Sequence, residues 1–387
     1  MSQTKKVGIC ACYDSRNYGS MLQAYATQVA VTNLGYKSEF IVYKKKKDLL
    51  FMMKQIPRLF NRNLLSDKLL GLKKKTALRK HPQIQEKESI RQQAFVRFQK
   101  EYYKSFSETY YGYDALKEGA RNYGTVLVGS DQLWTPGGLA SNFYNLMFVP
   151  DEVNKVSYAT SFGVSSIPWY QKKRTYNYLI RINHLSVREL KGAEIVKEIA
   201  NRNAAVVADP TLLLTKEDWE QCIPVKTIVQ KPYIFCYFLG ENPEHRTIAN
   251  ELKEKTGLDI VCTPFLDSFV ESDQAFGDKQ LFDIGPHDFI NLIRNAEYVL
   301  TDSFHGSVFS IIHHKKFVVF NRYSEGDNSR NSRIDSLLSI LGLESRRYKK
   351  DVYNEIMQDI DYNSVDSRRN NLRTESEKYL KAALESN

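Results

Sequence analysis

The sequence predicts an α/β protein in which two Rossmann-like domains face a cleft. Short apolar runs alternate with amphipathic helical segments along the first 200 residues, and the same alternation starts again near residue 232. Alternating strands and helices imply parallel sheets covered by helices. The expected domains are residues 1–200 and 201–350, followed by a C-terminal helix within residues 351–387.

The first strand–helix–strand unit opens the chain. The apolar run VGICAC (7–12) predicts a strand, and a turn-rich loop follows it. Apolar residues at helical spacing predict a helix over residues 20–35, with Gly35 as its C-terminal cap. SEFIVY (38–43) is the next expected strand, and later ones are expected within 124–134 and 155–163.

The second domain repeats this order. Strands are expected at 232–240, 258–264, 297–303 and 317–322, and helices at 245–257, 287–296, 307–315, 332–343 and 368–384. Loops that follow parallel strands meet at one edge of their sheet. Polar residues in those loops are therefore the first candidates for a functional site.

Composition excludes several classes of protein. The chain has 387 residues, 42% of them hydrophobic and 26% charged, which is typical of a folded soluble protein and not of a disordered one. It has no run of about 18 apolar residues and no apolar core of a secretion signal, so a cytoplasmic location is expected. Of the five cysteines, Cys10 and Cys12 lack a second pair to complete a zinc site, so we expect no metal.

The positive charge is concentrated in one segment. The formal net charge is +10, and residues 44–104 contain 18 Lys and Arg against 5 Asp and Glu. We expect a basic helical insertion over residues 44–106. Bulky apolar residues such as Phe51 and Leu64 lie among these cations, which favours docking on an anionic membrane surface. An insertion packed on the protein and an oligomer contact are the alternatives, and without a recognised motif nucleic acid is not an expected partner.

Six segments, taken in order, resemble a known family. They are VLVGSDQLW, YATSFG, SVREL, ADPTLLL, VLTDSFHGSVFSIIHHKKFVVF and NSRIDSLLSILGL, and the N-terminal RNYGSMLQAYA fits the same pattern. Over about residues 7–345 the chain is similar to the bacterial polysaccharide pyruvyl transferases, least so in the basic segment. The resemblance implies a glycosyltransferase-B-like arrangement of the domains. It also implies transfer of a pyruvyl group from phosphoenolpyruvate onto a sugar, as a cyclic ketal across two hydroxyls.

Such a reaction needs an acid, a base and a site for anions. An acid protonates the methylene carbon of the enol phosphate, a base takes the proton of the attacking hydroxyl, and cations or N–H groups hold the carboxylate and phosphate. His305, in TDSFHGS, is the expected proton carrier, because an imidazole gives and takes protons near neutral pH. The N–H groups of Gly306 and Ser307, at a helix expected to start near Ser307, are expected to hold the anion. A packed histidine in a tight turn is the alternative.

Arginines are expected to complete the donor site. Arg188 in SVREL matches the S-x-R element of the family, and the resemblance implies that it contacts phosphoenolpyruvate and takes part in catalysis. Many members carry an arginine two residues before the histidine, where this chain has Ser303. Either Ser303 bonds the anion or another cation replaces the arginine. The candidates are Arg330, Arg333 and Arg322.

The first domain is expected to hold the sugar acceptor. The candidate residues lie in two loops after strands and are Asn17, Tyr18, Gly19, Ser130, Asp131, Gln132 and Trp134. Short polar side chains can bond sugar hydroxyls, and an aromatic ring can support a sugar face. A simple turn at 17–19 and a core position for Trp134 are the alternatives. Asp209, in ADPTLLL, is expected to fix the hinge between the domains rather than touch substrate.

The expected function follows from the resemblance. It is pyruvyl transfer, without a cofactor, onto a hexose of a lipid-linked capsular, exopolysaccharide or cell-wall glycan precursor at the inner face of the membrane. The alternatives are a sugar-nucleotide-dependent glycosyltransferase of the same architecture and a non-catalytic scaffold for glycan assembly. The chain has neither G-x-x-x-x-G-K-[ST] nor G-x-G-x-x-G, so phosphate loops of these two types are excluded.

Overall fold

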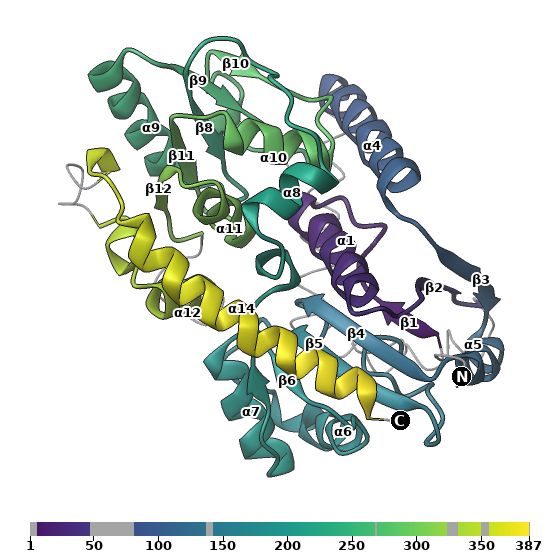
Figure 1. Cartoon of the computed structure of the whole chain (residues 1–387). Helices are drawn as coiled ribbons and strands as arrows, with labels where there is room; N and C mark the ends of the chain where they lie inside the picture. The colour runs from purple at the N-terminus through teal and green to yellow at the C-terminus, as the bar shows by residue number, and fades with distance from the viewer. Residues whose placement is uncertain are drawn as a thin grey trace.

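Two parallel sheets with helices on their faces form the fold (Figure 1). The structure is a computed structural model that describes residues 6–46, 81–136, 142–267, 269–322, 332–349 and 356–386. The strand orders are β3-β2-β1-β4-β5-β6-β7 and β10-β9-β8-β11-β12, and every neighbouring pair is parallel. The predicted class, α/β with two Rossmann-like domains, is confirmed.

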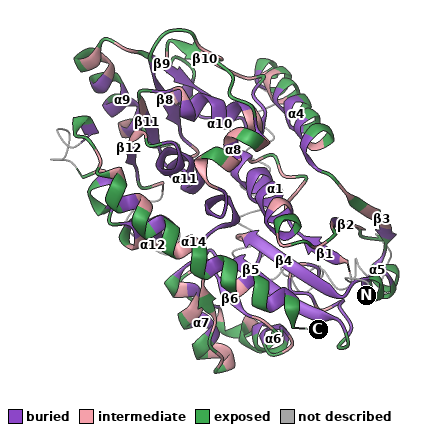
Figure 2. Cartoon of the chain, viewed as in Figure 1, coloured by how far each residue is buried: buried purple, intermediate pink, exposed green. Residues whose placement is uncertain are grey.

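The strands of the first sheet lie between residues 7 and 206. They are β1 (Val7–Cys10), β2 (Ser38–Lys44), β3 (Phe106–Tyr111), β4 (Thr125–Asp131), β5 (Asn154–Thr160), β6 (Ser186–Val187) and β7 (Ala205–Val206). Those of the second sheet are β8 (Tyr233–Tyr237), β9 (Asp259–Cys262), β10 (Lys279–Gln280), β11 (Tyr298–Thr301) and β12 (Lys316–Val319). The central strands are buried on both faces (Figure 2), as expected where helices cover a parallel sheet.

Helices connect and cover the strands. In the first half they are α1 (Tyr18–Asn33), α4 (Pro82–Tyr102), α5 (Tyr113–Gly119), α6 (Trp169–Leu179) and α7 (Leu190–Ala200). In the second half they are α8 (Lys216–Cys222), α9 (Pro243–Thr256), α10 (Pro286–Arg294), α11 (Phe304–Ile312), α12 (Ser332–Leu341) and α14 (Tyr362–Glu385). The short 3₁₀ turn η4 (Pro210–Leu212) lies on the connection between the two sheets.

Helix α1 lies at the interface of the two halves, and this explains why it is buried on almost all sides. Asn17 caps it, because the Asn17 Oδ1 accepts a hydrogen bond from the Ser20 N–H (3.1 Å). Gly35 follows its end with a φ of +87°, as predicted for a C-terminal cap. In its first turn, the Tyr18 ring stacks on Phe289 of α10 with 4.8 Å between ring centroids.

Two long helices tie the halves together. Helix α4 packs against α10, and its Arg91 pairs with Asp267 (2.6 Å). Helix α14, the long yellow helix of Figure 1, runs across both halves. At its start the Tyr362 hydroxyl donates to the Lys315 carbonyl (2.5 Å), and near its end the Ala383 carbonyl accepts from the Asn154 Nδ2 (2.8 Å).

The expected basic insertion is described only in part. Residues 81–106 form α4 and the start of β3, and the apolar face of α4 packs on the protein through Ile84, Phe95 and Phe98. Most of the apolar and basic residues on which the membrane prediction rests, at 47–80, lie outside the described residues. That prediction therefore stays untested.

Candidate active site

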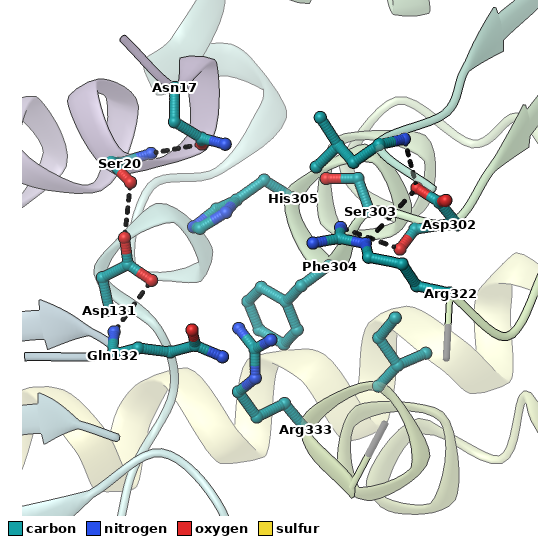
Figure 3. Close-up of a pocket in the computed structure, with 12 residues that line it drawn as sticks. Asn17, Ser20, Asp131, Gln132, Asp302, Ser303, Phe304, His305, Arg322 and Arg333 are labelled. Atoms are coloured by element: carbon teal, nitrogen blue, oxygen red, sulfur yellow. Dashed lines mark hydrogen bonds and ion pairs between the residues drawn. The ribbon is translucent and has the colours of Figure 1, made fainter. Parts of the chain in front are cut away.

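A cleft between the two sheets gathers polar side chains from both halves of the chain. Its volume is about 180 Å³. It is lined by Asn17, Ser20, Asp131, Gln132, Leu239, Asp302, Ser303, Phe304, His305, Arg322, Arg333 and Ile334 (Figure 3). These residues lie just beyond the carboxyl ends of strands or in the first turns of helices. Open parallel sheets bind their ligands at this edge.

His305 lies in the first turn of α11, directly after β11. This helix starts at Phe304, earlier than predicted. Ser303 caps it, because the Ser303 Oγ accepts a hydrogen bond from the Gly306 N–H (3.4 Å). The Ser307 N–H donates to the Ser303 carbonyl (3.0 Å). The expectation that Gly306 and Ser307 offer free N–H groups to an anion is therefore wrong, since both groups already have partners.

The His305 side chain reaches toward the first domain. Its ring packs on the backbone of Gly19, so closely that a Cβ on Gly19 would lie 2.0 Å from Nδ1. On the other side of the ring, Nε2 lies 3.7 Å from Oδ1 of Asp209. A glycine at position 19 and a buried carboxylate at position 209 thus fix where the imidazole stands.

Asp131 ends β4 and faces His305 across the cleft (Figure 3). Its φ of +68° is unusual for a residue other than glycine. Its Oδ2 accepts from the Ser20 hydroxyl (2.5 Å), and its Oδ1 accepts from the Gln132 N–H (2.9 Å). Burial alone would raise the pKa of this carboxyl, but the charges of Arg188 and His305 outweigh burial and lower it. Asp131 is therefore an ionised acceptor at neutral pH.

Arg188 follows β6 and lies within a group of carboxylates. Its Nη1 donates to Asp209 (2.8 Å), Nη2 lies 3.8 Å from Asp131, and Nε lies 4.0 Å from Glu189. Its guanidinium also stacks over the Phe304 ring, 4.4 Å from the centroid. Burial alone would lower the pKa of Arg188, but these carboxylates raise it. A permanent, buried cation thus holds the carboxylates that surround His305.

Asp209 is the most highly bonded carboxylate of the site. It is buried at the start of η4, between the two sheets, and accepts hydrogen bonds from Ser130, Arg188 and Thr211. Burial would raise its pKa, but His305 and Arg188 lower it well below its usual range. Asp209 therefore links the end of β4, the end of β6 and the α11 histidine in one charged network.

Two further arginines lie on the wall of the cleft that the second half of the chain forms, opposite Asp131. Arg333, in the first turn of α12, faces Gln132, whose amide oxygen lies 2.5 Å from Nη2 when the amide is oriented to accept. Burial and the charge of Arg188 lower the pKa of Arg333 to about 10, so it is still a cation at neutral pH. Arg322 follows β12 and donates to the Asp302 carbonyl (3.1 Å). The Arg322 Nε also lies 3.7 Å from the Asp302 Oδ1, so this carboxylate balances part of its charge, and Arg333 completes the cationic side of the cleft.

A model of one protein family matches the chain over residues 17–324, and the description of that family is polysaccharide pyruvyl transferase. The chain belongs to the polysaccharide pyruvyl transferase family. The matched range includes every cleft residue except Arg333 and Ile334. No curated protein matches the chain.

This member of the pyruvyl transferase family is similar to several solved structures. The UDP-GlcNAc 2-epimerase of Methanocaldococcus jannaschii has a TM-score of 0.50 and 10% identity, with 91% of each chain covered. The glycosyltransferase SnogD of Streptomyces nogalater (TM-score 0.45, 9% identity, 98% of each chain) and MurG of Acinetobacter baumannii (0.44, 9%, 99%) also match. Likeness at this identity concerns the fold alone. The fold is glycosyltransferase-B-like, as the resemblance implied.

The structure brings most of the predicted residues of the pyruvyl transferase to one place. Asn17, Asp131, Gln132, Ser303, His305 and Arg333 line the cleft, Gly19 supports His305, and Ser130 bonds Asp209 behind it. Arg330 lies outside the described residues.

Three of the predicted contacts need correction. Trp134 is fully buried against Phe162 and Tyr178, and its Nε1 donates to the Tyr144 carbonyl (3.0 Å), so it is a core residue and not a sugar platform. Tyr18 is likewise buried, between Phe95 and Phe289. Arg188 is held by carboxylates behind Phe304 and does not line the cleft.

Sequence reasoning missed several functional candidates. The sequence patterns do not indicate Ser20, Asp302 or Glu189, and for Asp209 they indicate only a role at the hinge. Asp302 accepts from the Leu239 and Gly240 N–H groups (2.8 and 2.7 Å), which fixes the loop after β8. A signal was available, because each of these acidic residues lies within three residues of a strand end.

The described part of the chain contains neither a cluster of metal ligands nor a helix that could span a membrane. No group of three or more His, Cys, Asp or Glu side chains there is arranged to hold a metal ion. None of its helices combines the length and the apolar character that crossing a bilayer requires.

Proposed function

We propose that this protein transfers a pyruvyl group from phosphoenolpyruvate onto a hexose of a glycan precursor, forms a cyclic ketal and releases phosphate. The observation that carries the proposal is the position of His305, between the cationic wall of Arg322 and Arg333 and the carboxylate of Asp131. The anion phosphoenolpyruvate needs a cationic wall, and the sugar hydroxyl that attacks it needs an opposite wall that can accept a hydrogen bond. The family membership of the chain supports the reaction class.

The donor side of the proposed site is formed by the second domain. Arg333 and Arg322 would hold the carboxylate and phosphate of phosphoenolpyruvate, because guanidinium groups bind such anions with two parallel hydrogen bonds. Ser303, which lines the same wall, stands where many family members have an arginine. Arg333 supplies its cation from the next helix, α12, in place of that arginine. These side chains can neutralise the phosphate, so the proposal requires no metal.

His305 would move the protons. Its imidazolium protonates the methylene carbon of phosphoenolpyruvate, and positive charge develops at the adjacent carbon. A sugar hydroxyl attacks that carbon and gives its proton to the neutral imidazole. The carbon–oxygen bond to phosphate then breaks, a neighbouring hydroxyl closes the ketal, and its proton leaves with the phosphate. The methylene carbon takes one proton from His305, and the two sugar hydroxyls release one proton each. One of these returns to His305 and the other leaves with the phosphate, so His305 ends in its starting protonation state.

The acceptor would lie against the first domain. Asn17, Ser20, Asp131 and Gln132 offer amide, hydroxyl and carboxylate groups on that wall, and such groups bond sugar hydroxyls. Asp131 stands opposite the proposed donor site. Arg188 and Asp209 act through these residues as positioning groups, since neither lines the cleft.

The proposal includes a place of action. A lipid-linked capsular, exopolysaccharide or cell-wall precursor would be presented at the inner face of the cell membrane, and the basic residues 44–104 would attract the enzyme to anionic lipid there. Loss of binding to anionic vesicles at high salt is the expected behaviour, because exposed charges are screened by salt.

One experiment tests the reaction directly. Purified protein is incubated with phosphoenolpyruvate and a panel of lipid-linked and synthetic glycans, and phosphate release and product mass are measured. The expected mass gain equals phosphoenolpyruvate less phosphoric acid. His305→Ala should slow the reaction about 10²–10⁴-fold, whereas His81→Ala, at the start of α4 and away from the cleft, should not.

A binding measurement separates this proposal from the main alternative. Phosphoenolpyruvate should raise the melting temperature of the protein, because a ligand that binds the folded state stabilises it. Stabilisation by a sugar nucleotide and not by phosphoenolpyruvate would instead favour a glycosyltransferase of the same fold.

A further inference from the structure

An exposed aromatic stripe runs along α6 of the first domain. Trp169, Lys173, Tyr176 and Ile180 follow one another at intervals of four, three and four residues, which places them on one face of the helix. Trp169 is 83% exposed, Tyr176 44% and Ile180 46%. Large apolar side chains aligned in this way on a solvent-facing helix mark a contact surface.

The opposite face of α6 already has a partner. Thr175, Tyr178 and Leu179 are buried, and the Tyr178 ring packs on the core residue Trp134 with 5.4 Å between centroids. The helix is therefore fixed to the domain by one face. The stripe on the other face is not needed to hold the helix in place.

Positive charge surrounds the stripe. Residues 165–181 contain Lys172, Lys173, Arg174 and Arg181 and no Asp or Glu. Two acidic residues from outside this range balance part of the charge, because Lys172 pairs with Glu198 (2.7 Å) and Arg181 with Asp151 (2.8 Å). Lys173 lies on the stripe itself, and the positive charges of the face outnumber these two carboxylates. Lysine and arginine extend their apolar stems along such a surface while their charges reach outward. The partner surface should therefore be apolar beneath an anionic layer.

We propose that this face of α6, together with the adjacent Tyr170, docks on an anionic lipid bilayer. Tryptophan and tyrosine rings favour the boundary between headgroups and acyl chains, where an aliphatic residue such as Ile180 also inserts. Lys173, on the stripe itself, can reach the acidic headgroups, and the excess positive charge of the face attracts them. A glycan would stack on the rings but would leave Ile180 and Lys173 without a role, so the bilayer fits the whole face.

The docked helix would keep the cleft close to the bilayer. Gly163, at the end of the loop after β5, packs on the side chain of Gln132 in the cleft wall. Trp169 follows Gly163 by six positions, and a chain of that length spans at most about 20 Å. A lipid-linked acceptor would then meet the cleft without leaving the surface. This advantage rests on the proposed function, whereas the docking itself does not.

The chain carries its own reporter for docking. Trp134 and Trp219 are fully buried, so of the three tryptophans only Trp169 is exposed to solvent. Insertion of α6 should shift tryptophan emission to the blue and protect it from acrylamide when phosphatidylglycerol–phosphatidylcholine vesicles are added to the full chain. Pure phosphatidylcholine vesicles should produce a smaller shift, since they attract no cations.

Two variants separate this surface from any other. Trp169→Ala with Tyr176→Ala should weaken sedimentation with anionic vesicles by at least about tenfold, because two large side chains no longer insert. Trp169→Phe should sediment like the wild type but lose the blue shift. Val225→Ala, which removes an exposed apolar side chain from the loop before β8, serves as the control and should change neither.

Three results would overturn the proposal. They are no binding to anionic vesicles, binding without a change at Trp169, and unchanged binding of the double variant. The second would place the contact elsewhere, for instance in residues 47–80. A blue shift with a glycan oligomer but none with vesicles would assign the stripe to carbohydrate. All of these readouts are independent of pyruvyl transfer, so failure of the docking and failure of the proposed reaction are distinguishable.

Discussion

The imidazole of His305 rests on the backbone of Gly19, and a Cβ at Gly19 would lie 2.0 Å from its Nδ1. Gly19 belongs to the first turn of α1 and His305 to the first turn of α11, so one contact joins the two halves of the chain. Next to it, Tyr18 stacks on Phe289. The distance between the halves and the position of the proposed proton carrier are therefore set together.

Gly19→Ala should displace His305 without unfolding α1. Alanine favours a helix more than glycine does, but its methyl group occupies the place of the imidazole. A displacement of about 1 Å in a catalytic group reduces turnover about 10²-fold. Pyruvyl transfer should fall by about this factor while far-UV circular dichroism keeps its helical signal. The melting temperature should fall as well, because the methyl group would also lie 2.7 Å from the Cβ of the buried His305. Full activity of this variant would show that the ring can function elsewhere.

Asp209→Asn should lower both stability and turnover. It leaves the buried Arg188 without its shortest ion pair and removes a negative charge 3.7 Å from the His305 Nε2. Loss of one partner of a buried pair costs about 3–5 kcal/mol, which urea unfolding measures. Turnover should fall as well, because the His305 ring loses the carboxylate beside its Nε2 that helps to position it. Unchanged turnover in a destabilised variant would show that Asp209 supports the fold and not the position of His305.

Arg333→Ala should weaken binding of phosphoenolpyruvate. The substitution removes a partly buried cation from the cleft wall, and a hydrogen bond to a charged group contributes about 1.5–3 kcal/mol, or roughly 10–100-fold in affinity. Calorimetric titration measures this affinity. Arg97→Ala, which removes an exposed arginine paired with Asp283, is the control and should bind normally. Equal affinity in the two variants would remove Arg333 from the donor site.

Acid should destabilise the protein before its carboxylates titrate. Burial lowers the pKa of His313 to about 2 and that of His245 to about 4. Below a pH of about 6.5 the unfolded chain protonates these side chains and the folded chain does not, so the unfolded state gains protons. Stability should fall as the pH falls, by up to about 1.4 kcal/mol per pH unit for each histidine.

His313→Leu should reduce that dependence. Neither ring nitrogen of His313 has a hydrogen-bond partner among the described residues, so leucine loses no bond there. Denaturant unfolding between pH 7 and about 4.5 gives the slope of stability against pH, and this window lies above the ordinary carboxyl range. An unchanged slope in the variant would mean that His313 is protonated in the folded state.

Replacement of Trp134 by alanine should lower the stability of the fold far more than the same replacement of Trp169. Trp134→Ala empties a packed core position and should cost about 3–5 kcal/mol. Trp169→Ala removes an exposed ring and should change the stability by about 0.5 kcal/mol or less. Parallel urea titrations compare them. Equal losses would contradict the burial of one ring and the exposure of the other.

Local patterns in the sequence predicted most of the regular elements. The strands at 7–10, 38–44 and 298–301 agree with their apolar runs, because a strand buried on both faces has few polar residues. Edge strand β3 was missed, since its residues alternate in exposure and lie beside the basic segment. The start of α11 was placed three residues late, because FHGS resembles a loop and only the cap by Ser303 reveals the helix.

The candidate site could be predicted only in part. His305 and Asp131 could be predicted because polar residues after parallel strands meet at one edge, and Arg333 as a cation that could replace the arginine absent at Ser303. Burial could not be predicted: Trp134 and Asp131 are neighbours in one loop, yet one is in the core and the other in the cleft. The sequence around Asp209 indicates only a hinge. Its contacts with Arg188 and His305 could not be predicted, because these residues are 21 and 96 positions away in the sequence.

The sequence by itself determined the α/β class, the family and the edge of the sheets where the site would lie, because apolar periodicity and strand-end loops are local features. The tertiary structure decided which side chains share that site. The packing of α1 against α10 and α11 brings Gly19 to His305, and the burial of Arg188 among three carboxylates removes it from the cleft. Charges far apart in the sequence interact strongly only when folding takes them out of water and places them in contact.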